Sequence, residues 1–303
     1  MFVDRLLRQE EILSGDHIKT MFIQGLFEGV INGAILALIA MGVALVWGVM
    51  NILSFSQGEF LMLGMFVSYY SNLYLGLEPI FALPISMLAL FLLGLLIYKT
   101  IIAKALKGPR LSQRLITFAL SMVLINSALL FFGAEFKAVP NVGVKGTFDL
   151  GWLIIAKQKL VPFIIALSVA AGMYAFLQYT RVGKAIQATA MDKNAASLVG
   201  IDTERIYAYA FGLSSAIAGG AGCALTYYYY LYPSVGANFQ LWGFIAVAMG
   251  GFGSVTGAFI SGLVMGIADT LTGLYVNTAI KYIGVCLVFL ITLTFRPKGI
   301  FGR

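Results

Sequence analysis

Residues 32–64 read NGAILALIAMGVALVWGVMNILSFSQGEFLMLG, an apolar run followed by a short polar stretch and a second apolar run. The first run begins near residue 22, and a helix of that length, at about 1.5 Å per residue, is longer than the ~30 Å hydrocarbon core of a bilayer. The polar stretch, Asn51 to Glu59, separates it from the apolar residues 60–75. The pattern predicts a bent or strongly tilted membrane helix that ends in an irregular break.

The rest of the chain repeats this apolar character. Its 303 residues are only 11% charged, with a mean hydropathy of +0.92, and apolar runs near the ~20 residues needed to cross a bilayer recur along it. In a bilayer these runs must be helical, because an open sheet would leave backbone groups unpaired in hydrocarbon. We therefore predict an all-α, polytopic transmembrane bundle with broken or half-span helices. The apolar segments are 22–50, 60–75, 79–103, 116–133, 161–179, 206–231, 242–252, 256–275 and 282–295.

Several kinds of site are not indicated by the residues. Cys223 and Cys286 both lie in apolar runs and His17 is the single histidine, so neither a disulfide framework nor a Cys/His metal site is expected. No stretch matches the phosphate-binding pattern G-x-x-x-x-G-K-[ST], so any ATP would bind to another subunit. Residues 1–21 lack an apolar centre and are expected to form an N-terminal surface segment rather than a cleavable signal, with the transmembrane domain over 22–303.

The distribution of Lys and Arg predicts the topology. Basic residues are concentrated in 104–115, 181–205 and 296–303, which we place in the cytoplasm. The connection 134–160 must then lie outside, although it also contains lysines. Counting three crossings back from residue 104 places the N-terminus outside as well.

A polar, small-residue stretch over 183–202, GKAIQATAMDKNAASLVGID, separates two long apolar runs. Asp192 can cap a short helix over 193–199, and Gly200 can end that helix in the left-handed conformation that favours glycine. Asp202 can then cap the next helix. These features predict a short capped helix at the cytoplasmic surface.

The short helix carries small side chains at helical spacing. Ala195, Ala196 and Val199 are predicted to share one mildly apolar face. The alternative is a solvated loop with ordinary caps.

The stretch resembles the cytoplasmic EAA-type loop of bacterial ABC importer permeases, and in particular of LivH-type branched-chain amino acid permeases. Loops of this kind dock into a groove on the ATPase subunit. The resemblance implies the following coupling residues: Lys184, Ala188, Asp192, Ala195, Ala196, Val199, Gly200, Ile201 and Asp202.

Other motifs resemble the same family over roughly residues 22–303. GGFGSVTGA from Gly250 is similar to its Gly-Gly-x-Gly-Ser-x-x-Gly break, and RPKG at 296–299 to its Arg-Pro-x-Gly tail. At 54–59 the family commonly has Asn-Phe-Ala-His-Gly-Glu, whereas this chain reads SFSQGE and lacks the histidine. The family's Asn-Gly and Gly-Glu pattern is matched by Asn32, Gly33, Gly48, Gly58, Glu59 and Gly64.

Two glycine-rich polar breaks, one in each half of the chain, are what a transport pathway needs. Irregular backbone at membrane depth is tolerated where it is buried or lines an aqueous cavity. We call residues 51–59 the first break and residues 250–257 the second break. Their positions suggest an internal repeat of 22–150 and 151–303, although plain cytoplasmic turns are the alternative. The predicted pathway residues are Glu28, Asn32, Asn51, Ser54, Ser56, Gln57, Gly58, Glu59, Gly250, Gly251, Gly253, Ser254 and Gly257.

Two further features are open to more than one interpretation. Glu59 is expected either to cap a helix that begins at Phe60 or to line the pathway. Glycines 29 and 33, and glycines 262 and 266, have the spacing that allows close helix packing, or that serves contact with a second permease subunit.

Together these features predict a transport-type membrane protein with a cytoplasmic docking loop. The resemblance implies that it is a permease subunit of an ABC importer for branched-chain or other small hydrophobic amino acids in the bacterial inner membrane. The resemblance implies two ATPase subunits that bind ATP and Mg, a second permease subunit, either LivM-like or a copy of this chain, and an extracytoplasmic solute-binding protein. The chain itself is expected to be no enzyme and to hold no metal or cofactor, and nucleic acid is not an expected partner. Alternatives are a urea or short-amide permease and an ion-coupled carrier that uses Glu59 and Asp269.

Overall fold

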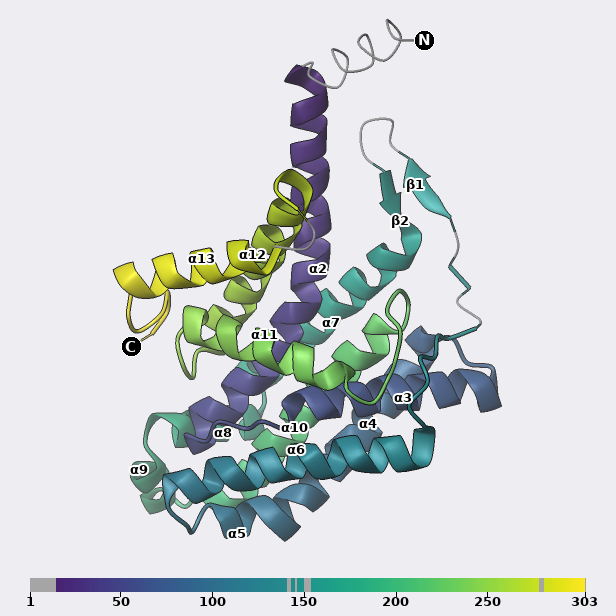
Figure 1. Ribbon diagram of the computed structural model, residues 1–303. Helices are drawn as coiled ribbons and strands as arrows, with labels where there is room; N and C mark the ends of the chain where they lie inside the picture. Colours follow the sequence, from purple (N-terminus) through teal and green to yellow (C-terminus); the bar gives the residue numbers. More distant parts are fainter. Residues whose placement is uncertain (1–14, 141–142, 145, 150–153, 278–280, 303) are drawn as a thin grey trace, which may run out of the picture.

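The computed structural model describes residues 15–140, 143–144, 146–149, 154–277 and 281–302, and every predicted apolar segment falls largely within one of its helices (Figure 1). The predicted N-terminal surface segment lies outside the described residues as far as residue 14, and from Gly15 the chain is helical. A π-helix, η1 (Tyr98–Ile102), joins α4 to α5. The α-helices are α2 (Gly15–Met50), α3 (Gln57–Leu75), α4 (Pro79–Ile97), α5 (Ala103–Ala105), α6 (Arg110–Phe132), α7 (Lys157–Tyr179), α8 (Arg181–Met191), α9 (Lys193–Leu198), α10 (Thr203–Leu225), α11 (Val235–Gly250), α12 (Val255–Tyr275) and α13 (Lys281–Phe295).

Six of the described helices are long and apolar enough to cross a membrane. Most of the apolar length of α2 and α10 is buried, whereas at most a third of the apolar length of the other four is buried, as expected for helices that face lipid. The helix α11 has only 16 residues, about 24 Å, and is shorter than each of the six spanning stretches. The six spanning stretches are Thr20–Met50, Pro79–Ala105, Arg110–Phe132, Lys157–Tyr179, Thr203–Leu225 and Val255–Tyr275.

The all-α prediction misses one small feature. Strand β1 (Thr147–Asp149) pairs antiparallel with β2 (Ile154–Ala156), so that Thr147 lies opposite Ala156. Each strand has three residues, too few to show an alternating pattern in the sequence. The hairpin lies in the connection between α6 and α7.

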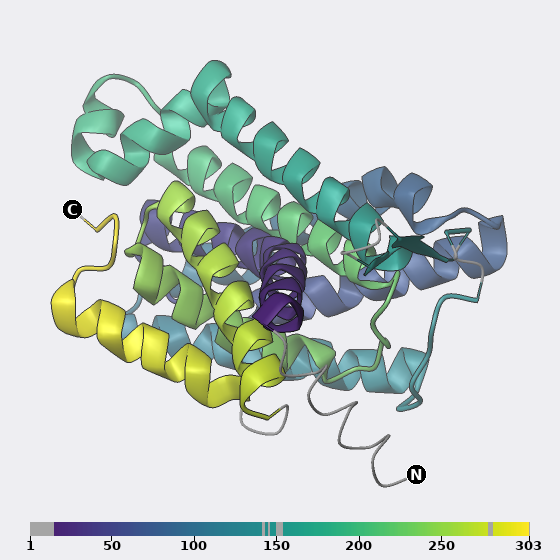
Figure 2. The ribbon, with the colours of Figure 1, turned by 90° about the horizontal axis from the view of Figure 1, so that it is seen from above.

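The long helix α2 runs through the middle of the molecule and bends along its length (Figures 1 and 2). Its main partner is α12, and the two helices meet through glycines. A Cβ built on Gly33 would lie 2.9 Å from the Cα of Leu263, and one built on Gly266 would meet Gly33. The two predicted glycine pairs therefore pack against each other, and the alternative that one of them serves a subunit interface is wrong.

The basic loops lie at one end of the molecule. Helix α9 and the C-terminal end share one side, and the β1–β2 hairpin lies on the opposite side (Figures 1 and 2). This arrangement is the one expected if 181–205 and 296–303 face the cytoplasm and 134–160 faces outside.

Candidate functional site

The polar stretch folds as two surface helices, whereas the sequence predicted one. Helix α8 begins after Thr180, whose hydroxyl oxygen accepts a hydrogen bond from the Gly183 N–H at 2.9 Å. Gly183, Ile186 and Thr189, spaced by three, turn inward and are buried. The cap and this spacing are the signals that the sequence reasoning missed.

The caps predicted around α9 are confirmed. The Asp192 carboxylate accepts hydrogen bonds from the N–H groups of Asn194 (2.8 Å) and Ala195 (3.1 Å). Gly200 has φ +85°, the left-handed conformation that ends a helix. Asp202 caps α10, accepting from the Arg205 N–H at 3.2 Å.

The face predicted for α9 is corrected by its burial. Ala196 is only 3% exposed and packs inward, so it is not available to a partner, while Ala195 is exposed. Leu198 and Val199 are 88% and 77% exposed, and Met191, at the end of α8, is 78% exposed. We call Met191, Ala195, Leu198 and Val199 the α9 patch. Met191 and Leu198 were not predicted, because a search for small side chains passes over larger apolar ones.

The remaining predicted coupling residues surround the patch or support it. Lys184 is exposed on α8, and Ala188 and Ile201 are half-buried. The Ile201 N–H donates to the Ala196 carbonyl at 3.1 Å, which closes the end of α9. The Lys193 ammonium lies 5.2 Å from the centre of the Tyr207 ring on α10.

The first break is mostly buried, which distinguishes it from a plain solvated turn. Ser54, Ser56, Gln57 and Glu59 are at most 1% exposed, and Gly58 is also buried. Only the first of its predicted residues, Asn51, is exposed, and it is the one described non-glycine residue with positive φ, at 55°.

Glu59 does not cap a helix. Because α3 begins at Gln57, Glu59 lies inside the first turn, and its carboxylate accepts a hydrogen bond from the Ser121 hydroxyl of α6 at 3.1 Å. The helix dipole favours an acidic side chain in the first turn, so Glu59 does mark the start of a helix. The helix begins three residues earlier than the sequence predicted.

The second break joins α11 to α12 and is held by the tail. Gly251 and Gly253 have φ of 101° and 86°, and Ser254 caps α12 by accepting from the Gly257 N–H at 3.0 Å. The N–H groups of Ile300 and Phe301 donate to the carbonyls of Met249 (2.9 Å) and Gly250 (3.0 Å).

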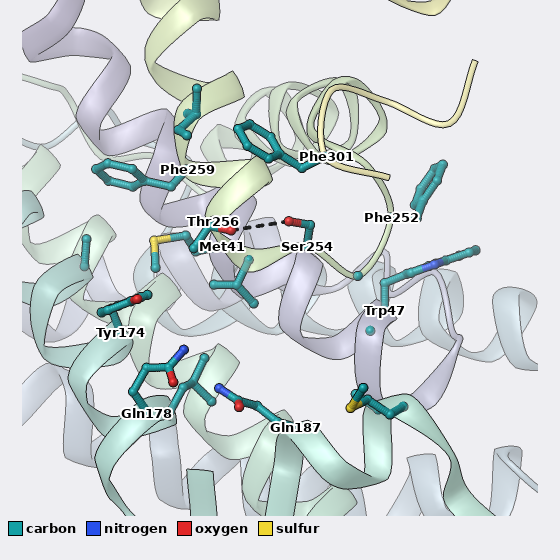
Figure 3. A pocket seen from close by; sticks show the side chains of 18 of the residues that line it. Met41, Trp47, Tyr174, Gln178, Gln187, Phe252, Ser254, Thr256, Phe259 and Phe301 are labelled. Carbon is teal, nitrogen blue, oxygen red and sulfur yellow. Dashed lines mark hydrogen bonds between the residues drawn. The ribbon is translucent and has the colours of Figure 1, made fainter. Parts of the chain in front are cut away.

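Both breaks contribute to the lining of a cavity of about 1150 Å³, the first through Asn51 and the second through Gly253 and Ser254. A Cβ built on Gly48, just before the first break, would lie 3.0 Å from the Cα of Gly253. Figure 3 shows Gln178 and Gln187 on one wall, and Ser254 and Thr256 on the other. None of the described lining residues is charged. The aromatic and polar members of the lining are Trp47, Tyr174, Phe252, Phe259, Phe301, Asn51, Gln178, Gln187, Ser254 and Thr256.

Among the predicted pathway residues, Asn51, Gly253 and Ser254 line this cavity and the others do not. Glu28 instead forms an ion pair with Lys159 at 3.3 Å. The Asn32 amide nitrogen donates to the Thr270 hydroxyl on α12 at 3.5 Å. The missed cavity residues on α7 and α8 are far from both breaks in sequence, so only the fold could bring them together.

Comparison with known proteins agrees with this architecture. Residues 25–293 match the family described as "Branched-chain amino acid transport system / permease component". The high-affinity branched-chain amino acid transport system permease protein LivH is 31% identical in both Salmonella typhimurium and Escherichia coli, over 93% of this chain and 96% of the relative. BraD of Pseudomonas aeruginosa, a permease protein described in the same words, is 27% identical over the same shares.

A solved structure supports the fold alone. PsaBC from Streptococcus pneumoniae, in complex with Fab, superposes with a TM-score of 0.51 over 92% of this chain and 97% of that chain, at 15% identity. The family match spans most of the chain, and the relatives match along nearly their full length. The protein therefore belongs to the branched-chain amino acid transport permease family, and is a multi-pass membrane permease component of an ABC transport system rather than its ATPase.

Proposed function

We propose that the α9 patch is the surface to which an ATPase subunit binds. Its exposed Leu198, Val199 and Met191 lie on a polar, water-facing segment, where lipid does not account for apolar side chains. The helices that carry and adjoin the patch, α8, α9 and α10, also carry exposed basic residues: Arg181, Lys184, Lys193 and Arg205. In the working complex two ATPase subunits bind ATP and Mg, and a second permease subunit, LivM-like or a copy of this chain, completes the membrane part.

The cavity is the cytoplasmic part of the translocation pathway in this proposal. Neutral amides and hydroxyls can hydrogen-bond to a zwitterionic amino acid, while the aromatic walls accept an apolar side chain. A lining without charge would hold such a solute weakly, as a conduit requires. An extracytoplasmic solute-binding protein then selects the substrate, and branched-chain amino acids fit better than urea, because most of the lining is apolar.

One residue links the surface to the cavity and carries the proposal. Met191 belongs to the α9 patch and also lines the cavity, together with Gln187 of the same helix. A force that moves the patch must therefore move a wall of the cavity. ATP hydrolysis on the partner would reach the pathway through α8.

The helix contacts support an internal repeat in which α2, α3 and α4 correspond to α10, α11 and α12. Helix α2 packs along α12 as α10 packs along α4, and α3 contacts α10 as α11 contacts α2. Helices α3 and α11 meet at Gly58 and Gly236, each the second residue of its helix. The repeat units in this proposal are α2–α4 and α10–α12, separated in the chain by η1, α5–α9 and the β1–β2 hairpin. Each unit falls largely within one of the two predicted halves, 22–150 and 151–303.

Leu198→Asp tests the docking proposal. Leu198 is 88% exposed, so a carboxylate there leaves the fold intact but removes an apolar contact from a small interface. We expect the permease to insert normally, and both ATPase co-purification and amino-acid uptake in proteoliposomes to fall about tenfold or more.

The control is Asn194→Asp, which adds the same charge to the exposed first turn of α9 without removing an apolar group. It should leave uptake near the wild-type level. Normal ATPase binding by Leu198→Asp would reject the α9 patch as the docking surface.

A further inference from the structure

The first turn of α3 has an unusual source of hydrogen bonds. A helix leaves its first N–H groups without partners inside the helix, and a side chain just before the helix usually accepts from one of them. Ser56 occupies that position but makes no such bond. Instead, the side-chain oxygen of Gln240, on α11, accepts from the Gly58 N–H at 2.6 Å.

The other end of the same amide holds the other side of the break. Gln240 Nε2 donates to the Ser54 carbonyl at 3.2 Å, so one side chain bonds the backbone on both sides of the start of α3. Gln240 is only 6% exposed, and water is not at hand to replace these bonds. Among the described residues, Thr117 of α6 is the other side chain that bonds the break's backbone, and it reaches only the Leu53 carbonyl.

The backbone of both helices is shaped to allow this contact. A Cβ built on Gly58 would meet the Gly236 carbonyl and would lie 2.9 Å from the Cβ of Gln240. Glycine at both positions lets α3 and α11 come close enough for the Gln240 amide to reach past the helix surface. The Gln240 side chain therefore links α3 and α11 through specific hydrogen bonds.

Helix α11 carries the link onward to the second break. Ten residues after Gln240, about 15 Å along the axis, α11 ends at Gly250, where the second break begins. The second break in turn packs against Gly48, in the last turn of α2 and three residues before the first break. We infer that Gln240 is a positioning residue that fastens the first break to α11, so that both breaks beside the cavity move as one unit during transport.

The inference rests on the proposed use of the cavity as a pathway, and Gln240→Leu tests it in the assembled complex. Leucine has a similar size but neither accepts from the Gly58 N–H nor donates to the Ser54 carbonyl. We expect the variant complex to keep its binding-protein-stimulated ATP hydrolysis within about twofold of wild type, while leucine uptake per ATP hydrolysed falls about tenfold. Gln240→Glu keeps an acceptor for Gly58 and should recover part of the loss.

The matched control is Asn238→Leu, which removes an exposed amide two residues earlier on the same helix and should transport normally. A purely structural role predicts less assembled complex with an unchanged uptake-to-ATP ratio, and that result would overturn the inference. So would equal ratios for Gln240→Leu, Gln240→Glu and wild type. If instead the wild-type complex shows no binding-protein-dependent uptake, the proposed function fails before Gln240 is compared.

Discussion

Gly58 shows how much a single missing side chain contributes at the centre of this protein. Its Cα faces the Gly236 carbonyl, and its N–H is the one held by Gln240. Gly58 has an ordinary helical backbone conformation. Glycine is therefore needed here because it lets α3 and α11 approach closely, not because it allows an unusual backbone conformation. Gly172, in the middle of α7, is the opposite case, because nothing lies within 4 Å of a Cβ built there.

Gly58→Ala should therefore be far more damaging than Gly172→Ala. The first adds a methyl group against backbone and should destabilise the permease by about 1–3 kcal/mol or more, whereas the second should raise stability slightly through helix propensity. Thermal unfolding of the purified permease, followed by fluorescence, measures both. Equal melting temperatures for the two variants would contradict the tight crossing of α3 and α11.

Among the secondary-structure elements, the sequence predicted the helix ends that depend only on neighbouring residues. The caps at Asp192, Gly200 and Asp202 could be read from the sequence because each depends on residues no more than three positions away. The direction in which Ala196 points could not, because it depends on what α10 places beneath α9. Helix α8 is different, because its cap at Thr180 and the spacing of Gly183, Ile186 and Thr189 are local signals from which it could have been predicted.

Gly200→Val tests how the end of α9 presents the α9 patch. A β-branched residue at φ +85° is strained by roughly 1 kcal/mol or more, so the end of α9 should rearrange and displace Val199. We expect ATPase affinity and uptake to fall together by severalfold. Gly200→Asn is the control, because asparagine tolerates this conformation and should retain most activity; a valine variant as active as the asparagine one would show that α9 does not depend on its left-handed end.

Across the whole molecule, the sequence predicted nine apolar segments correctly but not which of them touch. The breaks at Asn51 and Gly253 lie about 200 residues apart, and only their polar, glycine-containing character and their positions in the two halves marked them as related. The cavity between them also needs α7 and α8, whose lining residues carry no motif. Hydrophobic periodicity and composition predict each helix. Which helices pack together depends on the fit between two helix surfaces, and neither helix's sequence alone shows that fit.

Cysteine labelling tests the orientation of the assembled chain, in a background with Cys286 replaced. Leu198→Cys should react with a membrane-impermeant maleimide only from the cytoplasmic side, and Phe148→Cys, in β1, only from outside. Both side chains are exposed in the permease chain alone, so without bound ATPase subunits each variant should react from one side of the membrane. If the reagent labels Leu198→Cys in intact cells, the chain has the orientation opposite to the predicted one.

The glycine contact between α2 and α12 also has a consequence for biogenesis. The ribosome delivers α2 to the membrane more than 200 residues before it delivers α12, so the small-residue face of α2 must first be covered by lipid or by the insertion machinery. When α12 displaces the lipid or the insertion machinery from α2, the hydrophobic effect contributes little, because lipid tails are as apolar as α12. Close van der Waals packing between the two helices supplies the driving force instead. A bulky residue at Gly33 or Gly266 would thus be accepted during insertion and rejected only at the end, leaving a chain that is integrated, correctly oriented and recognisable to quality-control proteases.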